Sequence, residues 1–337
     1  MTRRLAFLSS APFLLALVLL ASLSLGGGSF HFRDMVQALV AFDAGNYDQA
    51  VILYQRLPRA LIAIYVGATM ACGGAVLQGL VRNPLASPST LGINAGACLF
   101  VVAGAFLFDL DIASLGLAAL AGAFSGFLFC LVIARLAGRT NDPRGLSLIL
   151  SGALVSMLLL GVTNAFLLSD PVRRSAFLSW VTGNINHVYI DRLYAFWWIG
   201  AAAIGILAIL ARPLTLILLG AEKAASAGVN VAIVTPLALA ATVLAAGSAV
   251  AICGPIGFVG LIVPHIVRPF AGNNFAFLLP ACAFTGASVC LLADLLAREA
   301  FQPYVLNTGL LMDLLGGLVF VVIVKRFYLS PAARREA

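Results

Sequence analysis

The chain has 337 residues, of which 62% are Ala, Val, Ile, Leu, Met, Phe, Trp, Tyr or Cys and only 10% are charged, and its mean hydropathy is +1.06. Soluble domains contain about 45–50% apolar and about 25% charged residues. A soluble fold of this length cannot bury so much hydrocarbon, which excludes a soluble enzyme or a DNA-binding protein. The net charge of +7 does not indicate a nucleic-acid partner, because the basic residues stand singly at the ends of apolar runs and there set membrane topology.

The apolar runs predict an all-α polytopic membrane protein, with about ten transmembrane helices in a single domain over residues 1–337. A helix needs about 20 apolar residues to cross the bilayer. In chain order the predicted spans are residues 5–25, 60–80, 91–108, 113–137, 146–168, 193–211, 231–253, 258–267, 275–297 and 304–324. The eighth is too short and too interrupted by Pro and His for an ordinary crossing.

The basic residues predict that both termini face the cytoplasm. Arg3 and Arg4 precede the first span, which we interpret as a membrane helix rather than a cleaved leader because further apolar runs follow it. The polar stretches 29–55 and 169–192 then lie outside. This threading puts most Lys and Arg inside, as the positive-inside rule expects, and leaves outside Arg33, Arg56, Arg59, Arg173, Arg174, Arg192 and Arg298.

The sequence contains no pattern for nucleotide hydrolysis, metal binding or redox chemistry. A P-loop places Gly before its Lys, and neither Lys223 nor Lys325, the only lysines, follows a Gly. The histidines His31, His187 and His265 are far apart, and the six cysteines lie in or beside apolar runs, as buried, inert thiols do. We predict no catalytic residue, no metal site and no cofactor bound by this chain.

Two acids could lie in the middle of the membrane, where a proton-coupled carrier needs a carboxylate. Asp294 has Arg298 four residues on, a spacing that favours a structural ion pair near a helix end. Asp313 has no such partner. A proton-coupled secondary transporter of a small solute therefore stays open as the alternative function, and an intramembrane enzyme as a third class.

Three segments occur together in a distinctive order. The first begins at Arg56-Leu57-Pro58-Arg59 and includes Gly67, Gln78 and Arg82-Asn83-Pro84-Leu85-Ala86-Ser87-Pro88. The second is Gly-Ala-Glu-Lys-Ala-Ala-Ser-Ala-Gly at 220–228, and the third is Gly-Pro-Ile-Gly-Phe-Val-Gly-Leu-Ile-Val-Pro-His-Ile-Val-Arg at 254–268. From about Arg56 to Phe327, this set closely resembles the FecCD-type permeases, the membrane subunits of ABC importers for iron-siderophores, haem and cobalamin.

The resemblance implies a type II ABC importer permease in the bacterial inner membrane. It implies a second permease subunit, identical or not, two cytoplasmic ATPase subunits that use ATP and Mg²⁺, and a periplasmic or lipid-anchored substrate-binding protein. The expected cargo is an iron chelate, first a ferric siderophore, with haem and cobalamin as alternatives. Transport is then expected to alternate access across the membrane, driven by the partner ATPases.

The resemblance also implies roles for particular residues. Arg56, Arg59 and Arg298 would form a basic rim that pairs with carboxylates of the binding protein, although interfacial snorkelling is the alternative. Residues 220–228, with Gly220, Glu222, Ala224, Ala225 and Gly228, would be the segment that couples to the ATPase, against the alternative of an ordinary loop. We call this segment the coupling segment.

Further residues resemble the inner gate and the structural motif of these permeases. Asn83, Leu85 and Arg144 would belong to the inner gate and translocation path. Pro84, Gly257, Pro264, His265 and Asp294 would be structural, with His265 hydrogen-bonded rather than a metal ligand. The sequence departs from the usual pattern at Ser87, where an acid is common, and at Asn273-Asn274, where a charged turn is usual.

Overall fold

The computed structural model describes residues 2–25, 32–40, 42–43, 45–137 and 145–327. These segments are helical or connect helices, and no strand occurs among them. The helices are α1 (Thr2–Ser24), α2 (Phe32–Val40), α3 (Tyr47–Val51), the π-helix η1 (Ile52–Arg56), α4 (Leu57–Val81), α5 (Ile93–Phe108), α6 (Ile112–Leu136), α7 (Leu146–Ser169), α8 (Pro171–Val181), the 3₁₀-helix η2 (His187–Tyr189), α9 (Ile190–Ile209), α10 (Ala211–Leu218), α11 (Ala221–Ser226), α12 (Val231–Cys253), α13 (Val259–Ala271), α14 (Phe275–Glu299) and α15 (Thr308–Phe327).

The described helices account for all the predicted spans. Seven are long and apolar enough to cross a membrane, and shorter apolar helices occur at Ile93–Phe108, Val259–Ala271 and Thr308–Val322. The predicted all-α membrane fold is therefore confirmed. The predicted seventh span matches α12 at both ends. The helix α13, which corresponds to the predicted eighth span, ends four residues beyond the predicted end.

Two stretches that were predicted to be polar connections contain helices. Residues 29–55 include α2, α3 and η1, and α3, η1 and α4 form one continuous rod from Tyr47 to Val81. The rod starts at Asn46, whose side chain caps the first turn by accepting hydrogen bonds from the backbone N–H groups of Asp48 and Gln49. Residues 169–192 likewise include α8, capped by Asp170.

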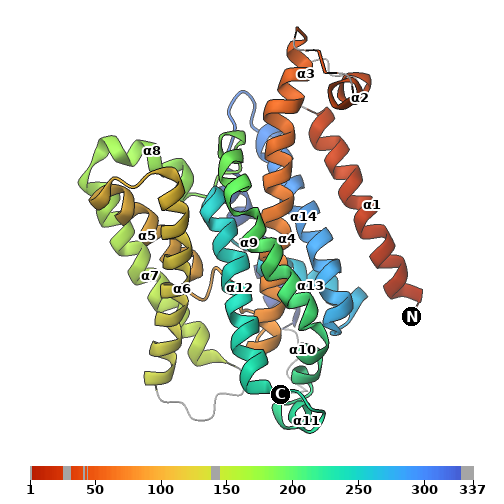
Figure 1. Ribbon diagram of the computed structural model, residues 1–337, viewed down its shortest axis with the longest axis vertical. Coiled ribbons are helices and arrows are strands. Elements are labelled where there is room, and N and C mark those ends of the chain that lie inside the picture. Colours follow the sequence, from red (N-terminus) through yellow and green to blue (C-terminus); the bar gives the residue numbers. More distant parts are fainter. Residues whose placement is uncertain (1, 26–31, 41, 44, 138–144, 328–337) are drawn as a thin grey trace.

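The centre of the bundle is formed by α4 and α12, whose side chains are mostly buried (Figure 1). Small residues let the backbones approach closely, as is usual between membrane helices. A Cβ at Gly67 would collide with the backbone of Gly286 in α14, and a Cβ at Gly74 would collide with the backbone of Gly260 in α13. The helices α4, α13 and α14 are therefore locked together by backbone contact.

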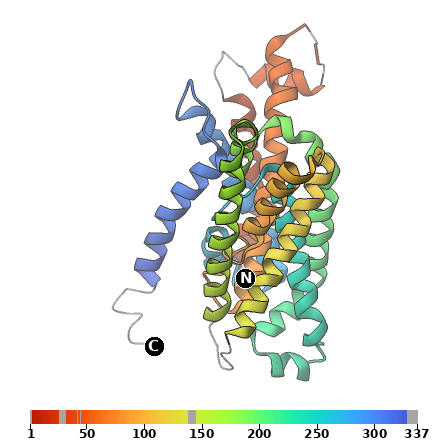
Figure 2. The same cartoon turned by 90° about the vertical axis from the view of Figure 1, so that its left-hand side faces the viewer.

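A second group, α5, α6 and α7, lies on one side of this centre, and α1 and α14 lie on the other (Figure 1). The helix α15 differs from the rest because it runs obliquely away from the bundle (Figure 2). Two hydrogen bonds hold its start: the Gly309 N–H donates to Gly183 O at 2.8 Å, and Asn307 Nδ2, just before the helix, donates to Thr182 Oγ1 at 2.6 Å. Further along α15, Leu311, Met312 and Gly316 are buried, and a Cβ at Gly316 would collide with Phe258. Its outer stripe, Leu310, Leu314, Leu318 and Val321, is exposed.

Candidate functional site

A buried ion-pair cluster lies near the end of the bundle that carries α2 and α8. Arg59, in the first turn of α4, faces Asp294 of α14: Nη2 lies 2.7 Å from Oδ1 and Nε lies 3.3 Å from Oδ2. Both nitrogens of the guanidinium fork therefore bind the same carboxylate. Asp294 has no exposed surface, and a carboxylate taken out of water in this way needs such partners to remain charged.

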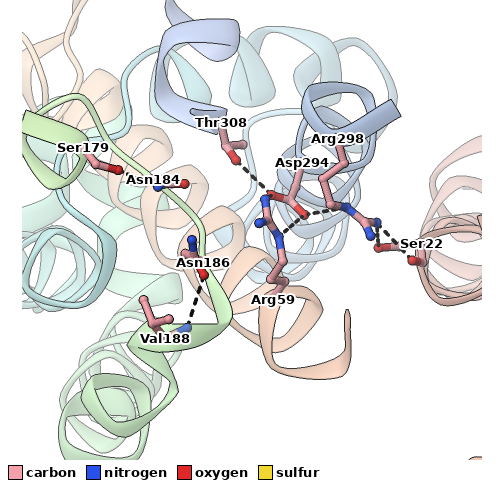
Figure 3. Close-up of polar contacts among 9 residues, drawn as sticks. All are labelled: Ser22, Arg59, Ser179, Asn184, Asn186, Val188, Asp294, Arg298 and Thr308. Carbon is pink, nitrogen blue, oxygen red and sulfur yellow. Dashed lines mark hydrogen bonds and ion pairs between the residues drawn. The ribbon is translucent and has the colours of Figure 1, made fainter. Parts of the chain in front are cut away.

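Asp294 has two further partners (Figure 3). Thr308 Oγ1, at the start of α15, donates to Asp294 Oδ1 at 2.9 Å. Arg298, one turn along α14, places Nε 3.5 Å from Oδ2, the ion pair that the spacing predicts, and Arg298 Nη2 donates to Ser22 O at 3.0 Å and to Ser22 Oγ at 3.1 Å. A single carboxylate thus joins α4, α14 and α15 and, through Arg298, the end of α1.

The three arginines of the predicted rim line one cavity of about 420 Å³, together with His187 and Glu299. Their guanidinium groups are not displayed on the surface. Arg56 is 5% exposed and Arg59 is 8% exposed, and Arg56 Nη1 donates to Leu23 O at 2.7 Å. Each of the three groups thus has a partner inside the chain, and their docking role stays a prediction.

The coupling segment projects from the opposite end of the bundle (Figure 1). Gly220 and Gly228, with φ of +125° and +84°, bracket the short helix α11, and such backbone angles favour glycine. Glu222, Ala225 and Gly228 are exposed. Ala224 is fully buried, so it holds α11 against the bundle instead of facing a partner.

The loop after α4 forms a rigid turn at the same end. Arg82 ends the helix in the left-handed conformation, with φ of 53°, and the buried Asn83 accepts a hydrogen bond from the Leu85 N–H at 2.9 Å. Pro84 continues this turn and lines, with Asn83 and Arg82, a cavity of about 440 Å³ that also includes Arg268. Arg144, the third predicted gate residue, lies outside the described residues.

The motif at 254–268 is held by an interaction between helices. Pro264 has no N–H to donate to Gly260 O, one turn earlier. Gln78 Nε2 of α4 replaces that donor, at 3.4 Å from Gly260 O and 3.1 Å from Leu261 O. His265 Nδ1 lies 3.0 Å from Leu261 O within its own helix, which fits a structural role.

The sequence of this chain is similar to that of several known membrane permeases. The sequence profile of the FecCD transport family matches residues 14–326. The chain belongs to this family. It is 34% identical to the probable siderophore transport system permease YfiZ of Bacillus subtilis (93% of this chain, 94% of the relative) and 36% identical to the Fe(3+) dicitrate permease FecD of Escherichia coli (86% and 89%). It is 34% identical to the hemin permease HmuU of Yersinia pestis (93% of both).

Solved structures agree with the family. A metal-chelate type ABC transporter in an inward-facing conformation superposes with a TM-score of 0.78 at 28% identity, covering 95% of this chain and 99% of its own. Another structure, of PsaBC from Streptococcus pneumoniae, shares the fold alone, with a TM-score of 0.56 at 18% identity, covering 90% and 98%. The chain is thus a multi-pass membrane permease of the ABC importer class, a transport subunit and not an enzyme.

The sequence did not indicate which residues of the FecCD permease site pair across helices, and it did not single out Thr308. The pairing of Arg59 with Asp294 joins residues 235 positions apart, and Thr308 and Gln78 act across helices that only the fold brings together. The sequence offered only indirect signals. Arg59 directly follows a proline at the outer end of a span, and Pro264 inside an apolar helix implies a carbonyl that needs a donor such as Gln78. Neither signal identifies the partner.

Proposed function

We propose that the chain is the transmembrane permease subunit of a binding-protein-dependent ABC importer for an iron chelate, with a ferric siderophore as the first candidate. The observation that carries the proposal is the family match over residues 14–326. The names of the relatives support the cargo class, because they refer to siderophore, Fe(3+) dicitrate and hemin. Because these cargoes differ from one relative to another, haem is a second candidate. Cobalamin is a third, on the resemblance to FecCD-type permeases.

The proposed complex contains a second permease subunit, two cytoplasmic ATPase subunits and a substrate-binding protein. The chain has no P-loop, so ATP and Mg²⁺ belong to the ATPases. The exposed face of α11, with Glu222 and Ala225, supports the coupling role, because it projects from the bundle where a partner can reach it. We place α11 and both termini in the cytoplasm, and the cavity of Arg56, Arg59 and Arg298 outside the inner membrane.

Transport in this proposal alternates access between the two sides of the membrane. Closure of the ATPases moves α11, and the movement passes to the bundle as a rocking of packed helices. The backbone contacts at Gly67 and Gly74 make α4, α13 and α14 move as one body. The helix α15, which runs obliquely and exposes an outer stripe, is the element that we expect to change its tilt.

Docking of the binding protein would act on the Asp294 cluster. Acidic side chains that enter the arginine cavity compete with Asp294 for Arg59 and Arg298, which the structure holds at 2.7 Å and 3.5 Å. Arginine suits such an exchange because one guanidinium can bind two carboxylates through different N–H groups. The cargo is released above the permease while this exchange takes place.

The test is the energy source of uptake in cells. Cells that depend on this chain are given ⁵⁵Fe-labelled siderophore, ferric dicitrate or haem, after treatment either with arsenate, which depletes ATP, or with a protonophore under conditions that preserve ATP. The proposal expects arsenate to stop uptake and the protonophore to leave most of it. The reverse pattern contradicts the proposal and supports the proton-coupled alternative. In this structure Asp294 is already paired with two arginines.

A further inference from the structure

A separate cavity, mainly apolar but with a few polar residues, lies where α5, α7, α15 and the segment after α12 meet. Its volume is about 330 Å³, and its polar lining includes Asn94, Ser156, Thr182 and Asp313. That volume is at the low end for ligand pockets, which hold about 300–1,000 Å³. The cavity therefore suits one arm of a cargo molecule and not a whole ferric chelate.

Asp313 brings an uncompensated carboxylate to this cavity. Within the described part of the chain, Asp313 makes no ion pair and no hydrogen bond. Ionisable groups at membrane depth are costly and mark ligand or ion pathways. Gly257 provides the space for it, because a Cβ at Gly257 would collide with Asp313 Oδ1.

Two neutral polar residues, Asn94 and Ser156, also line the cavity. Asn94 is 7% exposed, and its Nδ2 donates to Ile256 O at 3.5 Å, which orients the amide and leaves Oδ1 without a partner. Ser156 Oγ is also buried without a partner. Buried polar atoms are normally satisfied, but neither of these two atoms has accessible surface in this structure, so neither faces the cavity space.

The lining also selects the charge of the ligand. No Lys, Arg or His lines this cavity among the described residues, whereas Arg56, Arg59 and Arg298 line the cavity at the α2/α8 end. A carboxylate without a cationic neighbour attracts a cation that carries N–H groups and repels an anionic group.

We propose that this cavity binds a protonated amine of the transported chelate, with Asp313 as the charge partner. The inference rests on the proposed function, since it names a class of cargo: ferric chelates that bear an ammonium group. Anionic chelates are disfavoured at the same place. Because Asp313 lies on α15, cargo binding also adds a contact between that oblique helix and the bundle.

The test measures binding to the purified complex of permease and ATPases in nanodiscs, without the binding protein. Two ⁵⁵Fe-labelled probes are compared: a linear ferric trihydroxamate with a free primary amine, and the same complex with the amine acetylated. The wild type is expected to bind the amine-bearing probe about tenfold more tightly or better, the range of a charged hydrogen bond. Asp313→Asn is expected to lose this preference and Asp313→Glu to retain it.

Asp109→Asn serves as the matched control, because Asp109 is an exposed acid paired with Arg173 at 2.7 Å outside the cavity. It should keep the preference. Equal affinity for both probes, no measurable binding of the amine-bearing probe, or a preference that survives Asp313→Asn would each overturn the inference. The basal ATPase rate and the gel-filtration profile show whether Asp313→Asn is still folded and assembled.

The outcome is separable from that of the proposed function. ATP-driven uptake that occurs without any amine preference leaves the importer assignment intact and removes only the cargo inference. Asp313→Asn that stops uptake of both probes, together with wild-type uptake that collapses with the proton gradient, contradicts both and makes Asp313 a proton carrier.

Discussion

At the scale of single residues, Asp294 has the most connected side chain of the candidate site. Its carboxylate is fully buried and binds Arg59, Arg298 and Thr308. Replacing a buried ion pair by apolar groups can be neutral, but removing one partner leaves an uncompensated charge. The stability of this end of the bundle therefore depends on the carboxylate as much as on the arginines.

We predict that Asp294→Asn destabilises the permease by about 3–5 kcal/mol, because Arg59 stays buried without its counter-charge. Thr308→Val should cost about 1 kcal/mol, the loss of one hydrogen bond. Thermal unfolding of the detergent-solubilised protein measures both. Asp109→Asn is the control, since its pair with Arg173 is exposed and should contribute less than about 1 kcal/mol. An Asp294→Asn protein as stable as the control would show that the cluster does not support the fold.

Gln78 has a comparable role between helices, as the donor for the carbonyl that Pro264 leaves free. Gln78→Leu is expected to cost about 1–3 kcal/mol, the penalty of a buried unsatisfied carbonyl. In a Pro264→Ala background the cost should fall, because the restored backbone N–H bonds Gly260 O within the helix. A double-mutant cycle of unfolding free energies measures this coupling, and additive effects would contradict it.

At the scale of helices, the packing of α4 against α13 and α14 is what gives the permease a rigid half. Gly74→Ala should be strongly destabilising, because its Cβ meets the backbone of Gly260 and neither backbone can move without the other. Gly205→Ala on α9 is the matched control: nothing lies within 4 Å of its Cβ position, so alanine should be neutral or stabilising by up to about 1 kcal/mol. Thermal unfolding of the two variants measures the difference. Similar melting temperatures for Gly74→Ala and Gly205→Ala would contradict the claim that backbone contact makes α4, α13 and α14 one rigid unit.

The helix α11 has one face for the bundle and another for a partner. Ala225→Trp enlarges an exposed position, so it should leave folding intact and reduce co-purification of the ATPase subunits several-fold. Ala224→Trp, at a fully buried position, should instead lower the yield of folded permease. Pull-down yield and melting temperature separate these effects. Normal ATPase recovery with Ala225→Trp would place the coupling contact elsewhere.

The extent to which sequence predicts this structure differs between helices and contacts. The spans followed from apolar runs, and the ends of α12 were predicted because Asn230 and Gly254 bound its apolar run. The helix α2 was missed because its polar face resembles a loop. The burial of Arg56 and Arg59 was missed because the sequence around an arginine at the outer end of a helix does not show whether its side chain faces water or a buried partner. In the structure, Arg56 binds Leu23 O and Arg59 binds Asp294. Local pattern determines helices, whereas long-range contacts determine which charges remain free.

At the scale of the whole molecule, two helices of the described chain, α7 and α15, expose large apolar side chains on their outer faces. Exposed residues on α7 include Leu150, Leu154 and Met157, and α15 runs away from the bundle (Figure 2). Exposed apolar side chains are expected in lipid. The exposed carboxylate of Asp313 on α15 is not, because an ionisable group facing lipid is costly. A second permease subunit that covers this side would shield it, and native mass spectrometry of the purified complex is expected to show two permease subunits.

The most direct test of the account is iron uptake into proteoliposomes that contain either this chain alone or the chain with its ATPase and binding-protein partners. ATP is trapped inside the vesicles and ⁵⁵Fe-labelled chelate is added outside. We predict uptake only with the partners, only with hydrolysable ATP, and without change when the proton gradient is collapsed. Uptake by the chain alone, driven by a proton gradient, would contradict the assignment as a permease powered by partner ATPases.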